Sequence, residues 1–312
     1  MKTVKTRRAL LASLLAAAAV FSAGCSINNT GDSSSAETTA SAAESAQQTA
    51  APSAETNAPK TDAPKEDVPS DNKASVTLEG ASAKLSDGAK GIEVSGSVVT
   101  ITAGGEYTFE GKLDDGSIVV NVPKTDKVDI YLKNVEISSS SSAPVRVEQA
   151  DGVTLHLEDG TVNTFKDSAS NSFSACISAK DDLTIKGTGT LNVTGVAKHG
   201  IKSSNDVKIK NGIINISSAA TAIYGEDMVQ LTGGKITIES CKDGIKASNE
   251  TESDKGYVSS EDTEVDIKNA SGNGIEAITY VKVKSGSIRI HSVKNAVNCT
   301  NQELAEGCVT TY

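Results

Sequence analysis

Small residues followed directly by an aliphatic residue recur at near-constant intervals in the second half of the chain. The aliphatic members of six such pairs are separated by 24, 22, 22, 30 and 22 residues. The six pairs are Cys176-Ile177, Gly200-Ile201, Ala222-Ile223, Gly244-Ile245, Gly274-Ile275 and Ala296-Val297. A fixed interval of this size is typical of a repeat architecture in which each repeat packs on its neighbours.

Triplets in which aliphatic and polar residues alternate follow the pairs, and this period of two indicates short half-buried strands. One set of triplets lies six residues after the anchor: Leu183–Ile185, Val207–Ile209, Val229–Leu231 and Val281–Val283. A second set follows turns that contain Gly or Asn: Leu191–Val193, Ile214–Ile216, Ile236–Ile238, Val265–Ile267 and Ile288–Ile290. With the anchor, each repeat therefore contains three strands.

Three strands in about 22 residues leave no room for a crossover helix. The pattern predicts an all-β fold, a single-chain parallel β-helix in which equivalent strands of successive coils stack, wound right-handed by the crossover preference. The residues two places after each anchor are small, as a narrow interior corner requires: Ala179, Ser203, Gly225, Ala247, Ala277 and Cys299. We assign residues 76–312 to this fold, with residues 76–173 as irregular first coils and cap.

The chain begins with the pattern of a secretory signal. Basic residues between Lys2 and Arg8 precede the apolar run Ala9–Phe21. Residues 21–25 resemble a bacterial lipobox, although Ser22 departs from its usual aliphatic residue, and this predicts that residues 1–25 are a lipoprotein signal with lipidated Cys25. A plain secreted protein with an incidental Cys is the alternative. The prediction places the protein at the extracellular face of the cell membrane, held there by the lipid alone.

A linker follows the signal. Of the 50 residues 26–75, 30 are Ser, Thr, Ala or Pro, so the segment has too little apolar surface to fold and is predicted to be a disordered tether.

The whole chain has 30 basic and 40 acidic residues and a net charge of −10, which excludes the basic footprint of nucleic-acid binding. It contains six Tyr, four Phe and no Trp, too few rings for a flat aromatic platform on crystalline cellulose.

Six segments form an ordered set of motifs, each of which is weak alone: Val98–Tyr107, Ser142–Val145, Leu157–Thr164, Asp243–Ala247, Lys255–Val258 and Asn273–Ala277. In this order they resemble a family of secreted bacterial carbohydrate-binding β-helix proteins, typified by a clostridial cellulose- and pectate-binding protein. The resemblance covers residues 76–300. It implies a right-handed β-helix, calcium sites and binding of plant-wall or acidic polysaccharide.

If each anchor and the small residue two places later point inward, the residue between them points outward. This predicts an outward file of Ser178, Lys202, Tyr224, Lys246, Glu276 and Asn298. Stacked strands lie about 4.8 Å apart, comparable to the rise of one sugar in an extended chain. Lys202, Tyr224, Lys246 and Glu276 are therefore our candidate contacts for a pectate-like glycan, with Tyr224 as a stacking face. The alternative is that these lysines only keep an exposed strand face soluble.

The longest interval marks an acidic loop at 248–256, which we interpret as a candidate calcium site. Oxygen donors from this loop and adjacent turns could supply the six to eight ligands that calcium prefers. The candidate ligands are Asp227, Asp243, Asn249, Glu250, Glu252 and Asp254. Calcium would also bridge an acidic domain to a polyanion. A solvated acidic loop is the alternative, because Asp, Asn and Glu are common in turns.

No residue is predicted to be catalytic. Asp181-Asp182 lies in a turn, and turn chemistry accounts for it better than a hydrolytic carboxylate pair. The enzymatic alternative is a calcium-dependent pectate lyase with Lys202, Lys246 or Arg289 as base; a structural spacer or adhesin is a third hypothesis. Cys299 and Cys308 are the nearest pair for a disulfide, and a buried free Cys299 thiol is equally compatible. The whole sequence predicts a monomer that binds extracellular, acidic, pectate-like plant-wall polysaccharide with the assistance of calcium and does not cleave it.

Overall fold

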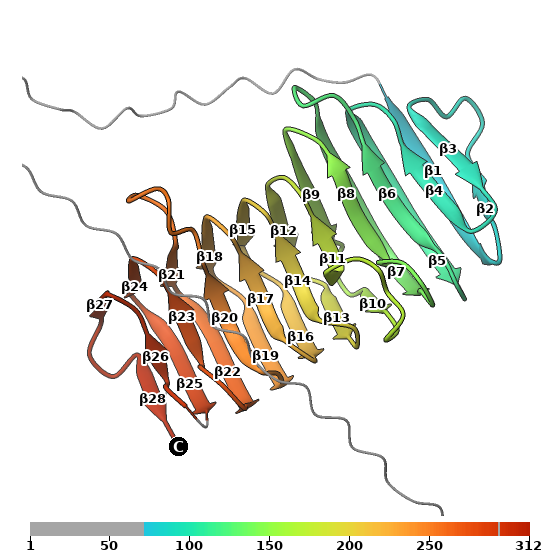
Figure 1. Cartoon of the computed structure of the whole chain (residues 1–312). Helices are drawn as coiled ribbons and strands as arrows, with labels where there is room; N and C mark the ends of the chain where they lie inside the picture. Colours follow the sequence, from blue (N-terminus) through green and yellow to red (C-terminus); the bar gives the residue numbers. More distant parts are fainter. Residues whose placement is uncertain (1–71, 293) are drawn as a thin grey trace, which may run out of the picture. The chain divides into compact units, whose positions relative to one another are not determined.

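The computed structural model describes residues 72–292 and 294–312, which form a coil of short β-strands (Figure 1). The predicted signal peptide, Cys25 and nearly all of the predicted linker lie outside the described residues. The first strand, β1 (Lys73–Gly80), begins before the expected boundary at residue 76. Its inward residues Ala74, Val76 and Leu78 are all buried, so the alternation that defines the strand starts earlier than the larger aliphatic residues suggest.

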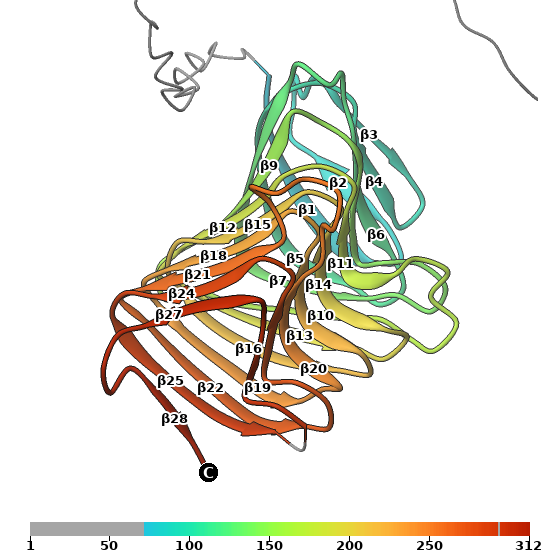
Figure 2. The same cartoon turned by 60° about the vertical axis from the view of Figure 1, so that its left-hand side comes forward.

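Successive strands of each coil belong to three stacks, called here stack 1, stack 2 and stack 3 (Figures 1 and 2). Stack 1 is a ten-stranded sheet of β3 (Ile92–Ser95), β4 (Val98–Ile101), β6 (Ser117–Asn121), β8 (Val145–Gln149), β11 (Ala175–Ala179), β14 (His199–Ser203), β17 (Thr221–Gly225), β20 (Asp243–Ala247), β23 (Ile275–Ala277) and β26 (Val297–Asn298). Stack 2 contains β9 (Gly152–Leu157), β12 (Leu183–Gly187), β15 (Asp206–Ile209), β18 (Met228–Thr232), β21 (Tyr257–Glu261), β24 (Tyr280–Val283) and β27 (Asn301–Leu304). Stack 3 contains β10 (Val162–Lys166), β13 (Thr190–Gly195), β16 (Ile213–Ser218), β19 (Lys235–Ser240), β22 (Thr263–Ala270), β25 (Gly286–Ser292) and β28 (Val309–Thr311).

The first coils are irregular, as expected. Three long strands, β1, β5 (Gly105–Leu113) and β7 (Lys127–Ser138), pair in parallel, and β7 is followed by both β9 of stack 2 and β10 of stack 3. Two strands reverse direction: β2 (Ala83–Leu85) pairs antiparallel with β1, and β3 pairs antiparallel with β4. The fully buried rings Tyr107, Phe109 and Phe165 lie in these coils, where they fill the interior.

The interior files confirm the predicted register. Ile201 pairs with Ile223, which pairs with Ile245, and all three side chains are fully buried. In the narrow corner beside them Gly225 is required by space, because a Cβ there would lie 2.0 Å from the Met228 carbonyl oxygen. Cys299 is the exception in this column, since it lies in the last coil and is only partly buried.

The described residues contain strands and turns, and none of their segments is a helix long and apolar enough to cross a bilayer. All four cysteines among them are free thiols: Cys176 and Cys241 are buried, and Cys299 and Cys308 are partly exposed. The nearest cysteine pair of the sequence is therefore not joined.

Candidate functional site

The predicted outward file runs up stack 1 in register. Ser178 pairs with Lys202, Lys202 with Tyr224, Tyr224 with Lys246, and Lys246 with Glu276. The file ends at Asn298, the partner of Glu276. Strand stacking therefore places these side chains one above another at about 4.8 Å intervals, as the sequence predicts.

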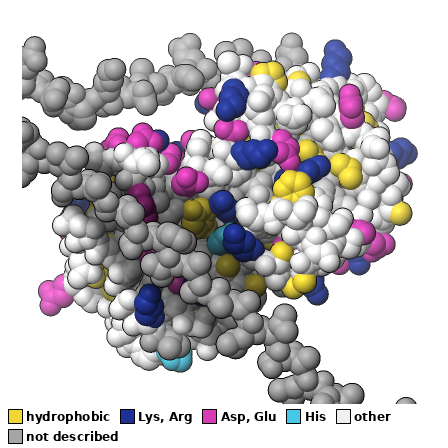
Figure 3. Space-filling model, in the orientation of Figure 1, with side chains coloured by type: hydrophobic (Ala, Val, Ile, Leu, Met, Phe, Trp, Pro, Cys, Tyr) yellow, Lys and Arg dark blue, Asp and Glu magenta, His cyan; other side chains and the backbone are white. Residues whose placement is uncertain are grey.

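Tyr224 is the centre of this file. The Lys202 ammonium lies 5.0 Å from the centroid of the Tyr224 ring, within the range of a cation–π contact. The centroid of the His199 ring lies 5.2 Å from that of the Tyr224 ring, and the two planes are tilted by 32°. The Tyr224 hydroxyl hydrogen-bonds to Ser248 Oγ. Tyr224 is thus held by three neighbours. The space-filling view of Figure 3 shows that Lys and Arg side chains are spread over the same face of the molecule as Asp and Glu side chains.

The Glu276 carboxylate is not free, because it is paired with Lys246 near the end of the outward file. Its Oε1 accepts from the Lys246 ammonium at 2.7 Å, and its other oxygen accepts from Asn273 Nδ2. Burial raises the pKa of Glu276, but these two hydrogen bonds outweigh burial and the net pKa lies below its ordinary value. Glu276 stays ionised and orients Lys246.

Arg146 extends the file toward the N-terminus, because it pairs with Ser178 in the coil below. Its guanidinium lies 4.7 Å from the Phe173 ring centroid and donates to Glu148 Oε1 at 3.3 Å, while its buried Nε has no hydrogen-bond partner among the described residues. Three cations thus alternate with Ser178 and Tyr224 along the file. The alternation Val145-Arg146-Val147 indicates that Arg146 points outward. The sequence repeat did not identify Arg146, because the interval from Val145 to Ile177 is longer than the regular one.

A row of buried polar side chains lies beside the file, where each coil passes from stack 3 into stack 1. Its members are His199, Thr221, Asp243 and Asn273, all less than 10% exposed. His199 Nδ1 accepts from the Thr221 backbone N–H at 3.1 Å, so the proton of the neutral ring is on Nε2. Burial, with Lys198, Lys202 and Lys246 nearby, lowers the pKa of His199 to about 4. The positive charge of the file therefore comes from Lys and Arg alone at neutral pH.

The candidate calcium ligands separate into three groups. Asp243 does not join the loop: it begins β20, is buried, and its Oδ1 accepts from the Asn273 backbone N–H at 2.9 Å. Expecting it at the loop was wrong, because the loop follows the opposite end of β20. Glu250 and Asp254 belong to the loop but are exposed.

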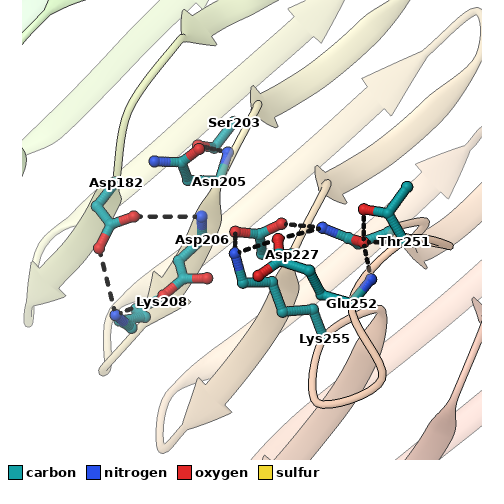
Figure 4. Close-up of polar contacts among 10 residues, drawn as sticks. Asp182, Ser203, Asn205, Asp206, Lys208, Asp227, Thr251, Glu252 and Lys255 are labelled. Atoms are coloured by element: carbon teal, nitrogen blue, oxygen red, sulfur yellow. Dashed lines mark hydrogen bonds and ion pairs between the residues drawn. The ribbon is translucent and has the colours of Figure 1, made fainter.

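The remaining three ligands, Asp227, Asn249 and Glu252, do converge (Figure 4). Lys255 lies between the two carboxylates, with its ammonium 3.0 Å from Asp227 Oδ2 and 2.7 Å from Glu252 Oε1. The Asn249 amide donates to Asp227 Oδ1 at 2.6 Å. Hydrogen bonds to Glu252 and Asp227 raise the pKa of Lys255. In this arrangement an ammonium ion takes the position between the carboxylates, so the residues as they lie do not fit a calcium ion and we assign no step to one.

The remaining charged candidates are also paired. Asp182 Oδ1 accepts from the Asp206 backbone N–H at 3.4 Å, and Lys208 contacts the carboxylates of Asp182 and Asp206 at 3.6 and 2.8 Å (Figure 4). Burial first, and Asp206 second, raise the pKa of Asp182. Arg289 lies on stack 3, where it contacts Glu264 at 3.0 Å. It is thus on a different stack from Lys202 and Lys246, the other two bases of the lyase alternative.

Comparison with known proteins places these features in a family. A model of the carbohydrate-binding domain-containing protein family matches residues 95–310. A carbohydrate-binding domain-containing protein of Acetivibrio thermocellus is 34% identical over 232 residues, which cover 72% of this chain and 81% of that protein. The solved structure of a polysaccharide lyase-like protein from C. thermocellum, a gadolinium derivative, matches with a TM-score of 0.72 and 31% identity, over 77% of this chain and all of that one. The chain described here belongs to the carbohydrate-binding domain-containing protein family.

Proposed function

We propose that the stack 1 outward file, from Arg146 to Lys246, binds an acidic polysaccharide of the pectate type and does not cleave it. The observation that carries the proposal is the spacing of its cations. Arg146, Lys202 and Lys246 occur on every second strand, with Ser178 and Tyr224 between them. Consecutive cations are therefore about 9.6 Å apart, twice the strand spacing.

This spacing suits an extended uronate chain. In a nearly two-fold glycan, alternate sugars present their carboxylates on the same side, and one sugar rises by about one strand spacing. Each cation would then meet a carboxylate of every second sugar, while the ring of an intervening sugar lies on Tyr224. The Lys246–Glu276 ion pair ends the row, because the Glu276 carboxylate would repel a further uronate.

The file spans four strand steps, which corresponds to about four or five sugars. Affinity for oligogalacturonides should therefore rise with chain length up to this size and then level off. A footprint of this kind is expected of a surface that binds the middle of a chain. The similarity to the carbohydrate-binding domain-containing protein of Acetivibrio thermocellus also supports binding.

Binding without cleavage fits the way in which the basic groups are engaged. Lys246 donates to Glu276, and Arg289, on another stack, contacts Glu264. Lys202 lies over the Tyr224 ring. The polysaccharide lyase-like relative keeps lyase activity as the alternative to be tested. Attachment through a lipid on Cys25 at the extracellular face of the membrane and a monomeric state belong to the same proposal, whereas calcium is kept only as a variable of the test, because Lys255 occupies the position between Asp227 and Glu252.

The test is calorimetric titration of the full chain with polygalacturonate, with calcium or with chelator, while absorbance is followed for unsaturated product. We expect Lys202→Met to weaken binding about tenfold, equivalent to about 1.4 kcal/mol. Lys210→Met removes the same charge from an exposed residue after β15, in stack 2, and is the matched control.

Three results would contradict the proposal, each differently. Equal affinities of Lys202→Met and Lys210→Met would remove the file as the contact surface. Unsaturated product that forms at a rate proportional to the protein concentration would establish lyase activity. No binding with either calcium or chelator would leave the spacer or adhesin hypothesis.

A further inference from the structure

A hollow of about 480 Å³ lies on the first coils, on the side of the coil formed by β1, β5 and β7. Tyr131 of β7 lines it, together with short hydroxyl side chains and one ion pair. The other lining residues are Lys73, Ala74, Ser75, Ser86, Glu106 and Thr108. A volume of this size is within the range of small-ligand sites.

The hollow arises from one outward file. Ser75 pairs with Thr108, Thr108 with Tyr131, and Tyr131 with His156. The Tyr131 and His156 rings stack with their centroids 4.1 Å apart and their planes at 22°. One face of Tyr131 is therefore covered, and the other looks along the file toward the short side chains of Thr108 and Ser75. A ring-sized space results beside an aromatic face.

Tyr131 is a fixed platform. His156 Nε2 lies 2.6 Å from Asp129 Oδ1, so the ring beneath Tyr131 is itself anchored. On the lateral side the wall is closed by Ser86, at the end of β2, whose Oγ accepts from the Ser75 backbone N–H at 3.1 Å. A flat group that enters the space meets an aromatic face whose orientation is already set, which lowers the entropic cost of binding.

The charges around the hollow select an uncharged ligand. Its two charged lining residues neutralise each other, with Lys73 Nζ 2.9 Å from Glu106 Oε2. Burial, followed by Asp129, Glu106 and Glu158, raises the pKa of Tyr131 against the smaller opposing effect of Lys73, so the net field at this ring is that of the carboxylates. A uronate placed here would be repelled, unlike one on the stack 1 outward file.

We propose that this hollow is a second glycan site, which takes one uncharged pyranose ring of a neutral oligosaccharide against the open face of Tyr131. The apolar face of the sugar would lie on the aromatic ring, about one strand spacing away. Its hydroxyls would hydrogen-bond with Ser75, Ser86 and Thr108, and with the Lys73–Glu106 pair. The site is independent of the proposed pectate surface, since it shares no residue with it.

The experiment titrates the isotope-labelled full chain with two neutral probes, xylohexaose and cellohexaose, and with pentagalacturonate, and maps the backbone amide shifts. We expect a neutral probe to shift Ser75, Thr108 and Tyr131. Tyr131→Ala should weaken its binding at least tenfold, whereas Tyr131→Phe, which keeps the ring, should bind within twofold of the unmodified protein.

Thr108→Tyr fills the hollow with a second ring and should block the neutral probe even if Tyr131→Ala proves unstable. Lys202→Met is the matched control and should leave neutral-probe binding unchanged, so failure of the pectate proposal would not mimic failure of this one. The proposal would be overturned if Thr108→Tyr still bound a neutral probe. It would also be overturned if neither neutral probe shifted the amides of Ser75, Thr108 and Tyr131, or if pentagalacturonate shifted them.

Discussion

One buried side chain, His199, should make the fold less stable as the pH falls from 6.5 to about 4. The residue is 9% exposed, its ring lies beside that of Tyr224, and its Nδ1 accepts from the Thr221 backbone N–H. Burial, with Lys198, Lys202 and Lys246, lowers its pKa from 6.5 to about 4. A second proton would add a buried cation next to these lysines and would end the hydrogen bond from Thr221.

The sign and size follow from proton linkage. Below pH 6.5 the unfolded chain binds a proton at this residue, while the folded protein does not bind one until about pH 4. Stability contributed by the neutral ring is therefore complete above pH 6.5 and is lost as the pH falls toward 4. The interval of about 2.5 pH units corresponds to about 3 kcal/mol. For a domain of this size, that is about 10 °C in Tm.

The measurement compares thermal or urea unfolding of the unmodified protein and His199→Asn between pH 7 and pH 4. Asn offers a side-chain oxygen that can accept from Thr221 but does not titrate. The carboxylates and the other histidines are common to both proteins, so only the difference between the two pH profiles reports on His199. We expect the unmodified protein to lose about 3 kcal/mol more than the variant. Parallel profiles would refute the reasoning.

Two further predictions concern packing and the acidic loop. Gly225→Ala should cost about 2–3 kcal/mol, because its Cβ would lie 2.0 Å from the Met228 carbonyl oxygen, whereas Gly152→Ala, whose nearest contact is 3.7 Å away, should be neutral in urea unfolding. Lys255→Met removes the ammonium group that lies between Asp227 and Glu252 and so opens this position to a cation. Calcium at about ten times its Kd for the variant should raise the Tm of the variant by about 3 °C more than that of the unmodified protein. Equal responses to calcium would show that the lysine does not compete with the ion.

The period of the sequence was sufficient to predict the stacks and the outward file, because in a β-helix the interval between repeats determines the register. Once Ile201 and Ile223 are equivalent, Lys202 and Tyr224 must be neighbours. The repeat did not predict that Arg146 belongs to the file, because the coil between Val145 and Ile177 is longer than the regular ones. The length change at 248–256 located the loop, but not the position of Lys255, since pairing inside a loop depends on local geometry that no repeat constrains.

Regular and irregular coils suit different ligands for a physical reason. In the regular coils every outward position is followed one strand later by another side chain, about 4.8 Å away, so a ring has little room to enter and a ligand must lie along the surface. A chain with its own repeat matches such a surface. A space for a single ring requires successive short residues beside a large one and a lateral wall. Thr108 and Ser75 beside Tyr131 meet the first condition, and Ser86 at the end of the antiparallel strand β2 meets the second. The coils that break the repeat are therefore where a site for one sugar can form, and they are also where the repeat could not reveal it.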